Sequence, residues 1–330
     1  MTEVIPRVHW LKLPLDMVKP TPPHVNAYLI QGDRGYLLVD TGWGTDETLD
    51  SVKKHLAAIG ADFKDISQII VTHIHPDHYG LAGKIKQLSG AKLAFHEIEK
   101  GFIESRYIHM ENLLSQTAHL LGMNGVPPDE LPLIKNATLG LEQFVSPVNP
   151  DVTFRGGETI AFGEFTFKIL LTPGHSLGHV CLYEPKKGIL ICGDHILPTI
   201  TPNTGRHPQS DENPLKSYLD SLNDMKNLGV DLVLPGHESP FDKFETRVNE
   251  LIQHHKERNH SILVNLKREP QTAYQIARGL VWGIAFAWPE MPAFHKRLAI
   301  SETLAHLTFM VDDGRLKQIA RDGMIYYRQN

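Results

Sequence analysis

The chain has 330 residues, of which 41% are hydrophobic and 22% are charged, and its net charge is −5. This composition is typical of a folded globular protein, and the length predicts one large domain with an appendage, or two domains. No run of about 18 uncharged apolar residues is present, so we expect no membrane span. The negative net charge argues against non-specific nucleic-acid binding by the whole chain. The unusual feature is the number of histidines, which is 19.

Cysteine usage and the N-terminal segment both favour a cytoplasmic location. Only two cysteines occur, Cys181 and Cys192, which is too few for a disulfide framework, and both are in apolar runs. The first 20 residues mix charges and prolines with short apolar runs, so they do not resemble a secretory signal.

The first 245 residues alternate short β-rich runs with helical stretches, which predicts an α/β fold. Strands are predicted at residues 25–31, 35–40, 67–73, 92–96, 164–172, 179–184, 188–194 and 230–237. Helices are predicted at 45–60, 77–89 and 211–229, with Thr45 and Asp211 as their N-terminal caps.

Residues 101–150 interrupt this alternation. We expect one amphipathic helix over 101–125, with Met110, Leu113 and Leu114 among its apolar positions, then a Pro-rich bend and a shorter helix. Such a helical insertion is either a surface elaboration or a lid over the site.

A change of charge and pattern predicts a second domain over residues 246–330. This tail carries 12 Lys and Arg against 8 Asp and Glu, a net charge of +4. It is predicted to form three helices, at 246–266, 271–280 and 299–314, and then a β-hairpin that turns at Asp322-Gly323. This order is that of a winged helix. The aromatic residues Trp282, Phe286, Trp288 and Phe294 suggest packing in a capping or dimerisation element, or a contribution to a substrate pocket.

The most informative string is His73-Ile74-His75-Pro76-Asp77-His78, directly after a predicted strand. Residues i and i+2 at a strand end project to the same side, so His73 and His75 can bind one metal ion. Pro76 suits a first helical position and places Asp77 and His78 at a helix N-terminus, where they can bind a second ion.

Three more candidate ligands follow apolar strands, each after a small residue. They are His175 in Pro173-Gly174-His175-Ser176, Asp194 after Gly193, and His237 in Pro235-Gly236-His237. Ligands at the ends of several strands converge on one edge of a sheet, which is where α/β proteins usually place their sites.

The motifs HxHxDH, PGHS, GD and PGH, in this order, resemble the metallo-β-lactamase fold superfamily over about residues 8–245. The resemblance implies an αβ/βα four-layer sandwich, and the tail is similar to that of the lactamase-β-like subgroup, close to glyoxalase II. Matched position by position, it implies first-metal ligands His73, His75 and His175, second-metal ligands Asp77, His78 and His237, a bridging Asp194, and a supporting Asp40.

Seven nitrogen and oxygen ligands without a thiolate predict a binuclear metal-dependent hydrolase with Asp77 and Asp194 as catalytic carboxylates. Two ions that share a bridging water lower its pKa, and the resulting hydroxide attacks the substrate. Two zinc ions are expected; iron or manganese would also suit such a site.

The expected substrate is a small-molecule carboxylic ester, in particular a thioester of the acyl-CoA or glutathione type, because the apolar insertion could cover a hydrophobic group. The alternatives are an endoribonuclease on single-stranded RNA, favoured by the basic winged-helix-like tail, and a lactonase. The acidic core weighs against the nuclease. Leu197 weighs against the lactonase, because such enzymes usually have a tyrosine there. The sequence leaves the oligomeric state open, and a homodimer is one of the alternatives.

Four other residues lie near these motifs in the sequence and are candidates for supporting roles. His179 is expected to form a structural hydrogen bond, whereas His195, His24 and Asn26 are candidates for substrate contact.

Overall fold

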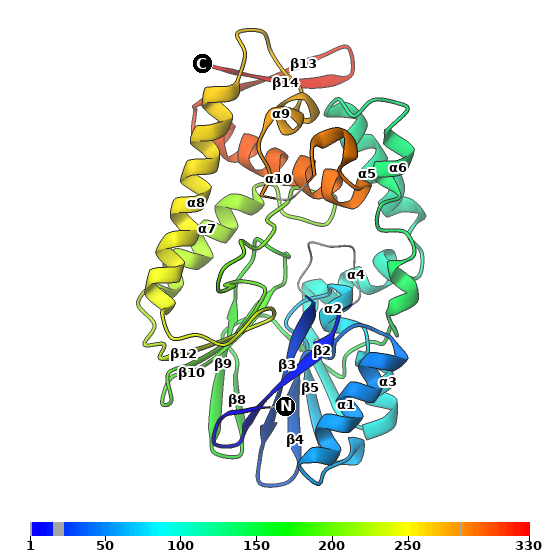
Figure 1. Cartoon of the computed structure of the whole chain (residues 1–330), viewed down its shortest axis with the longest axis vertical. Coiled ribbons are helices and arrows are strands. Elements are labelled where there is room, and N and C mark those ends of the chain that lie inside the picture. Colours follow the sequence, from blue (N-terminus) through cyan, green and yellow to red (C-terminus); the bar gives the residue numbers. More distant parts are fainter. Residues whose placement is uncertain (1, 16–22, 284–285) are drawn as a thin grey trace.

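The computed structural model describes residues 2–15, 23–283 and 286–330. Two β-sheets lie face to face in one half of the molecule, with helices on their outer faces, and a mostly helical region forms the other half (Figure 1). The larger sheet has seven strands in chain order, from β1 to β7, and the smaller sheet has five, in the order β12-β11-β10-β9-β8. None of the helices among the described residues is long and apolar enough to cross a membrane.

The strands of the larger sheet are β1 (Thr2–Ile5), β2 (Val8–Pro14), β3 (His24–Gln31), β4 (Tyr36–Val39), β5 (Ile66–Ile70), β6 (Lys92–His96) and β7 (Val152–Phe154). Those of the smaller sheet are β8 (Thr159–Phe162), β9 (Phe165–Leu171), β10 (Val180–Glu184), β11 (Ile189–Gly193) and β12 (Leu232–Pro235). The sequence patterns predicted eight of these strands; β1, β2, β7 and β8 were not predicted.

Three hydrophobic cores hold the layers together. Helices α1 (Asp46–Ala58) and α3 (Ala82–Ser89) pack on the outer face of the larger sheet, and their core includes Val52 and Ile85. The two sheets bury a second core between them, and helix α7 (Pro214–Met225) covers the outer face of the smaller sheet. The predicted four-layer α/β sandwich is therefore confirmed.

Strand direction decides where the chain can place a site. Strands β4, β5, β6 and β7 run parallel to one another. Strands β11 and β12 are parallel, and β9 shares their direction because both β9 and β11 are antiparallel to β10. The carboxyl ends of β4 and β5, and those of β9, β11 and β12, therefore lie at one edge of each sheet.

The insertion differs from the single long helix that was predicted. It contains α4 (Glu97–Tyr107) and α5 (Glu111–Met123), then α6 (Leu131–Lys135) and a 3-10 turn, η2 (Leu141–Phe144). The break falls at residues 108–110, where Ile108 leaves helical geometry with φ −122°. Its apolar side chain is 54% exposed, so no core packing at this position favours a continuous helix.

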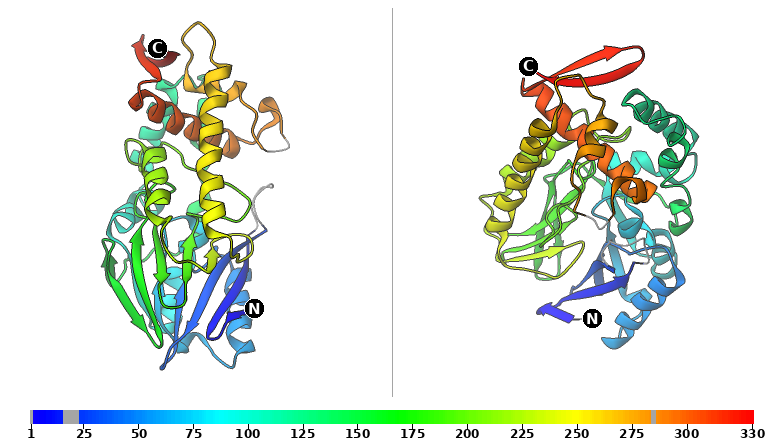
Figure 2. Two further views of the ribbon diagram at one scale, coloured as in Figure 1. Left: turned by 90° about the vertical axis from the view of Figure 1, so that its left-hand side faces the viewer. Right: turned by 45° about the horizontal axis from the view of Figure 1, so that its top comes forward.

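The tail consists of α8 (Phe244–Asn265), α9 (Ala273–Gly279), a 3-10 turn, η3 (Trp288–Glu290), α10 (Ala293–Asp312), and a hairpin of β13 (Leu316–Arg321) and β14 (Met324–Gln329). The hairpin turns at Asp322-Gly323, as predicted, and both residues have positive φ. Helix α8 runs without interruption from the smaller sheet to the far end of the molecule (Figure 2). Position 246 therefore lies within a helix that joins both halves.

The insertion and the tail share one hydrophobic core. Leu121 and Ile134 of the insertion pack with Tyr274, Leu304 and Tyr327 of the tail. The tail is thus packed against α5 and α6, and the two regions form the half of the molecule opposite the sheets (Figure 1).

Two predicted helices have different bounds in the structure. The helix expected at 77–89 is two helices, the short α2 (Pro76–Tyr79) and α3, because the chain turns at Gly80 and Leu81 between them. The helix expected to start at Asp211 starts at Pro214. Proline fits the first helical position, so the helix begins at Pro214. Asn213 is therefore its cap, and the Asn213 side chain accepts a hydrogen bond from the backbone N–H of Lys216.

Candidate metal centre

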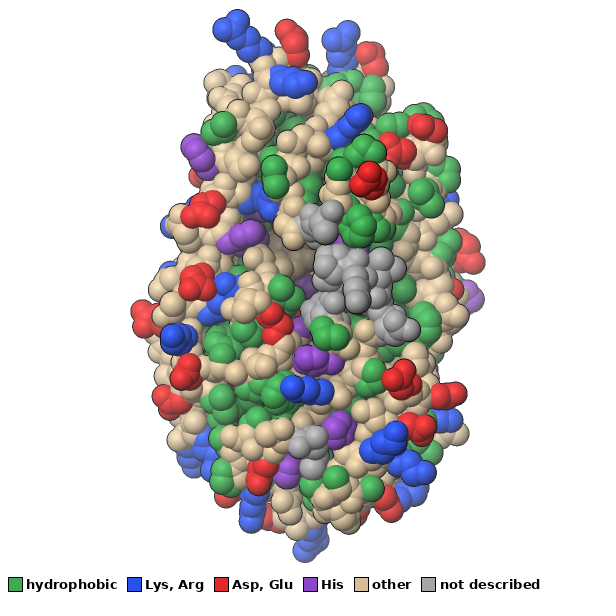
Figure 3. Space-filling view, in the orientation of Figure 1, with side chains coloured by type: hydrophobic (Ala, Val, Ile, Leu, Met, Phe, Trp, Pro, Cys, Tyr) green, Lys and Arg blue, Asp and Glu red, His purple; other side chains and the backbone are tan. Residues whose placement is uncertain are grey.

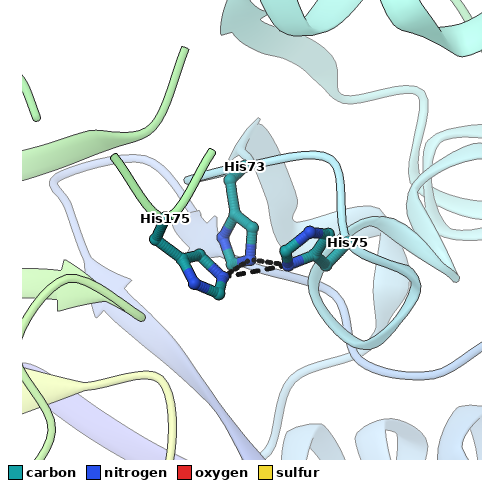
Figure 4. A group of neighbouring side chains, drawn as sticks. All are labelled: His73, His75 and His175. Carbon is teal, nitrogen blue, oxygen red and sulfur yellow. Dashed lines mark hydrogen bonds between the residues drawn. The ribbon is translucent and has the colours of Figure 1, made fainter. Parts of the chain in front are cut away.

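Three histidines from two loops meet at the adjoining edges of the sheets. His73 and His75 follow β5, and His175 lies between β9 and β10. The distances are 2.9 Å from His73 Nε2 to His75 Nδ1, 3.0 Å from His175 Nε2 to His75 Nδ1, and 3.3 Å between the Nε2 atoms of His73 and His175. The three rings point toward a common centre (Figure 4).

A second group of ligand-type atoms lies next to the first. His78 Nε2 is 3.4 Å from Asp194 Oδ1 and 3.7 Å from Asp77 Oδ2. His237 Nε2 is 3.2 Å from Asp77 Oδ2 and 3.4 Å from Asp194 Oδ2. Asp194 also reaches the first group, since its Oδ2 lies 3.7 Å from His175 Nε2. The structure thus brings together all seven side chains that the motifs singled out.

The spacing of these atoms fits metal ions. Nitrogen ligands about 2.0–2.1 Å from a tetrahedral zinc ion are about 3.3 Å apart, close to the separations in the three-histidine group. His78 Nε2 and Asp194 Oδ1 are buried and have no hydrogen-bond partner among the described residues. A Cβ atom on residue 236 would collide with Asp194 Oδ1, so glycine at this position leaves the carboxylate free to face the cluster.

Asp40 orients the HxHxDH motif. Its Oδ2 lies 2.8 Å from His78 Nδ1, which directs Nε2 of the same ring toward the other ligand atoms. Both of its oxygens also accept hydrogen bonds from Thr72, from the backbone N–H at 2.8 Å and from Oγ1 at 2.9 Å. Asp40 has φ +61°, a conformation that non-glycine residues rarely adopt and that these three contacts hold in place.

Backbone carbonyls orient two further histidines. His175 Nδ1 lies 2.8 Å from the carbonyl oxygen of Asn203, and His237 Nδ1 lies 3.2 Å from that of His24. The loop of Asn203 is tied to the tail, because the backbone N–H of Arg206 donates to the carbonyl of Ser301 on α10. The tail therefore helps to position a candidate metal ligand.

The sequence patterns missed one residue that organises the centre, Glu99. This side chain is fully buried, and its two oxygens accept hydrogen bonds from the backbone N–H groups of Ile74, at 2.9 Å, and Gly178, at 2.6 Å. It therefore joins the loop of His73 and His75 to the loop of His175. The available signal was a carboxylate three residues after the end of β6 at His96, in the first turn of α4.

The remaining candidates lie outside the cluster. His179 is fully buried, and its Nε2 accepts a hydrogen bond from the backbone N–H of Asp194, so it supports that ligand structurally, as expected. His195 is buried against Tyr218 and does not line the cavity described below. Asn26 donates to the carbonyl of Pro235, and so ties β3 to the turn that presents His237.

Electrostatics divide the centre into two halves. Burial and the neighbouring histidines lower the pKa of His73 and His75 well below the usual value, so both rings are neutral. Burial also acts against a charge on His237, but Asp194 and Asp77 raise its pKa to about 10. The first half thus offers free nitrogen lone pairs, and the second half attracts positive charge, which a divalent cation supplies.

A cavity of about 290 Å³ opens onto this cluster. His75, Asp77, His175, Asp194 and His237 line one end of it. Its other walls come from the insertion, the loop after β11, and α10 of the tail. The apolar lining residues include Trp43, Met110, Leu113, Leu114, Leu139, Leu141, Phe294 and Leu298. Of the four tail aromatics, Phe294 contributes to this cavity, whereas Trp288 is buried in the core of the tail.

Comparisons with known proteins agree with this geometry. Residues 20–237 match the model of the metallo-beta-lactamase superfamily. The chain is 26% identical over 322 residues to the probable metallo-hydrolase YqjP of Bacillus subtilis, covering 94% of this chain and 95% of that protein.

Two crystal structures are similar along nearly the whole chain. A metallo-beta-lactamase family protein from Thermus thermophilus is 30% identical with a TM-score of 0.83, covering 99% of this chain and 100% of that one. A beta-lactamase domain protein from Burkholderia ambifaria is 27% identical with a TM-score of 0.85, covering 100% and 94%. The chain belongs to the metallo-beta-lactamase superfamily, and it is a metal-dependent hydrolase with a His and Asp cluster suited to divalent metal ions.

Proposed function

We propose that this protein hydrolyses a carboxylic ester bond, specifically a thioester with a hydrophobic acyl group, by means of two metal ions. The observation that carries the proposal is the cavity, in which apolar walls lead directly to the cluster of ligand atoms. Esters and thioesters of hydrophobic acids need such an arrangement, because the acyl chain must leave water while its carbonyl reaches the metals.

The ligand atoms support two ions, with zinc as the expected metal. His73, His75 and His175 would hold the first, and Asp77, His78 and His237 the second. Asp194 would bridge them, since its two oxygens face His78 on one side and His175 on the other. Metal ions bound there would supply Lewis acidity toward a water molecule and the substrate carbonyl.

Side chains of the protein balance the charge of the metal ions and form the walls of the cavity beside them. Asp77 and Asp194 hold negative charge at the centre, which opposes the mutual repulsion of two cations. Met110, Leu113 and Leu114 of the insertion line the cavity and are only partly buried, so their side chains are available to a bound acyl group. We propose that α5 acts in this way as a lid.

The nuclease is the weaker alternative. Lys and Arg are scattered among Asp and Glu over the face shown in Figure 3 and form no continuous basic stripe there. An RNA backbone requires a track of basic groups leading to the metals. The winged-helix assignment of the tail remains a prediction, and the extensive packing of the tail against the insertion favours a capping role.

The third candidate function is a lactonase, and the position of Leu197 weighs against it. Leu197, which stands where such enzymes usually have a tyrosine, is buried and only 2% exposed. A buried leucine cannot replace a hydroxyl beside a substrate carbonyl.

A substrate panel on metal-loaded enzyme tests the proposal. We expect acyl thioesters to be hydrolysed with a higher kcat/KM than lactones, bis-p-nitrophenyl phosphate or single-stranded RNA. His75→Ala should abolish this activity, while His119→Ala, which changes an exposed histidine of α5, should retain it. RNA cleavage without thioesterase activity would overturn the proposal in favour of the nuclease.

The two free cysteines support the proposed cytoplasmic location. Cys181 and Cys192 are unpaired and buried, and burial raises the pKa of the Cys181 thiol to about 12. Such thiols are unreactive hydrophobic groups in a reducing compartment.

A further inference from the structure

Two arginines enter the cavity from opposite regions of the chain. Arg106 lies at the end of α4 in the insertion, and Arg297 lies on α10 of the tail. Both are partly buried, and both line the cavity beside the candidate metal ligands. Neither belongs to the motifs that identify the superfamily.

Among the residues that the structure describes, neither guanidinium has an acidic partner. Arg106 forms no hydrogen bond or ion pair with any residue that the structure describes. Arg297 donates only to neutral groups, the carbonyl of Lys135 at 3.0 Å and Oγ1 of Thr138 at 2.8 Å. Of the acidic residues described in the cavity lining, Asp77 and Asp194 belong to the metal cluster. A third, Glu142, accepts a hydrogen bond from the backbone N–H of Gly140 and pairs with neither arginine.

The positive charges are close enough to affect one another. Burial, followed by the charge of Arg106, lowers the pKa of Arg297 to about 10. Burial, followed by Arg106 and then Arg297, lowers the pKa of His207, another lining residue, to about 3. Two like charges in a cavity repel each other and lose solvation, so they are costly unless a bound anion offsets them.

We propose that Arg106 and Arg297 form an oxyanion subsite that binds a carboxylate or phosphate of the substrate, at a position separate from the scissile carbonyl. This inference rests on the proposed hydrolysis of an acyl ester and narrows its substrate to anionic compounds. Guanidinium groups present planar pairs of donors that match both anions. Because one arginine comes from the insertion and the other from the tail, the anion would contact both walls of the cavity.

The first test compares matched thioesters on the metal-loaded enzyme. Hexanoyl and adipyl thioesters of N-acetylcysteamine place a methyl or a carboxylate at the end of one acyl chain. Hexanoyl thioesters of pantetheine and phosphopantetheine add a phosphate on the thiol side instead. We expect kcat/KM to favour the anionic member of one pair, and the preferred pair shows which part of the substrate carries the anion.

Arg106→Gln carries the mutational test, since it removes a charge but no hydrogen bond within the described part of the chain. It should reduce the preference for the anionic member about 10- to 100-fold, the value of a hydrogen bond to a charged group. Arg297→Lys keeps the charge while removing the planar donors, and should reduce the preference less than Arg297→Gln. Arg328→Gln, on an exposed position of β14, is the control and should retain the wild-type preference.

Binding of inorganic phosphate, measured by calorimetry on the same metal-loaded proteins, tests the anion subsite independently of the proposed thioester hydrolysis. Phosphate affinity that falls in Arg106→Gln but not in Arg328→Gln supports the subsite even if no thioester is hydrolysed. Thioester hydrolysis with no preference for either anionic substrate, and with phosphate affinity unchanged in Arg106→Gln, would overturn the subsite and leave the proposed function intact.

Discussion

Replacing Glu99 is expected to weaken the fold and the metal centre together. Its buried carboxylate accepts the backbone N–H groups of Ile74 and Gly178, which lie in the two loops that carry His73, His75 and His175. A hydrogen bond to a charged group contributes about 1.5–3 kcal/mol. Glu99→Ala leaves both donors without a partner, so the free energy of unfolding should fall by about 3–6 kcal/mol, twice that range.

Glu99→Gln is the more informative variant because it preserves the volume of the side chain. The amide oxygen of glutamine can still accept a hydrogen bond from one backbone N–H group, but its NH₂ group faces the other N–H donor and cannot accept. The free energy of unfolding should therefore fall by about half as much as in Glu99→Ala, roughly 1.5–3 kcal/mol. The two loops should then hold their histidines less firmly. We expect metal affinity to fall by about 10- to 100-fold, the range observed when groups that orient metal ligands are changed.

Urea unfolding, followed by circular dichroism with and without metal, measures the loss of stability. Competition with a chromophoric chelator measures the loss of metal affinity. Glu97→Gln is the matched control on the same helix, since Glu97 is exposed and its ion pair with Arg155 lies at the surface. Such a pair contributes about 0–1 kcal/mol. If Glu99→Gln unfolds at the same urea concentration as Glu97→Gln and binds metal as tightly as the wild type, Glu99 does not hold the two loops together.

Three further predictions concern the metals and the cavity. His75→Ala should lose metal, by elemental analysis, and hydrolysis, while its circular dichroism stays native; full activity after chelation would refute the metal requirement. Asp194→Ala should lose at least one ion and turnover, and Asp194→Asn should retain more metal because an oxygen ligand remains; two bound ions and normal turnover in Asp194→Ala would exclude a bridging role. In the wild type we expect kcat/KM to rise about fourfold for each methylene of the acyl chain that is buried, at about 0.8 kcal/mol each. Leu114→Ala should weaken this dependence of kcat/KM on acyl length. An equal loss of kcat/KM for short and long chains would favour a purely structural role of α5.

Point substitutions are preferable to deletion of the insertion. Leu121 and Ile134 belong to the core of the tail, so removing residues 101–150 would expose that core as well as open the cavity. Leu114 lies on the part of α5 that faces the cavity, which separates the two effects.

Local patterns predicted the elements whose signals lie within a few residues. Thr45 caps α1 and Asp322-Gly323 forms the hairpin turn, because caps and turns depend on adjacent backbone groups. Prediction was poorer where packing decides the outcome. The amphipathic pattern of 101–125 runs through the exposed Ile108, and the sequence shows no proline or glycine there to mark the break.

The sequence by itself determined the class of fold and the set of chemically active side chains. Apolar strands followed by His and Asp motifs placed these side chains at strand ends, since strand periodicity and the termini of strands are local properties of the chain. Only the tertiary structure decided that Glu99 joins the two loops of candidate metal ligands, that His195 is buried away from the cavity, and that Arg106 and Arg297 line the same cavity. These relations connect residues far apart in the chain, and they depend on how the insertion and the tail pack against the sandwich, which no local pattern encodes.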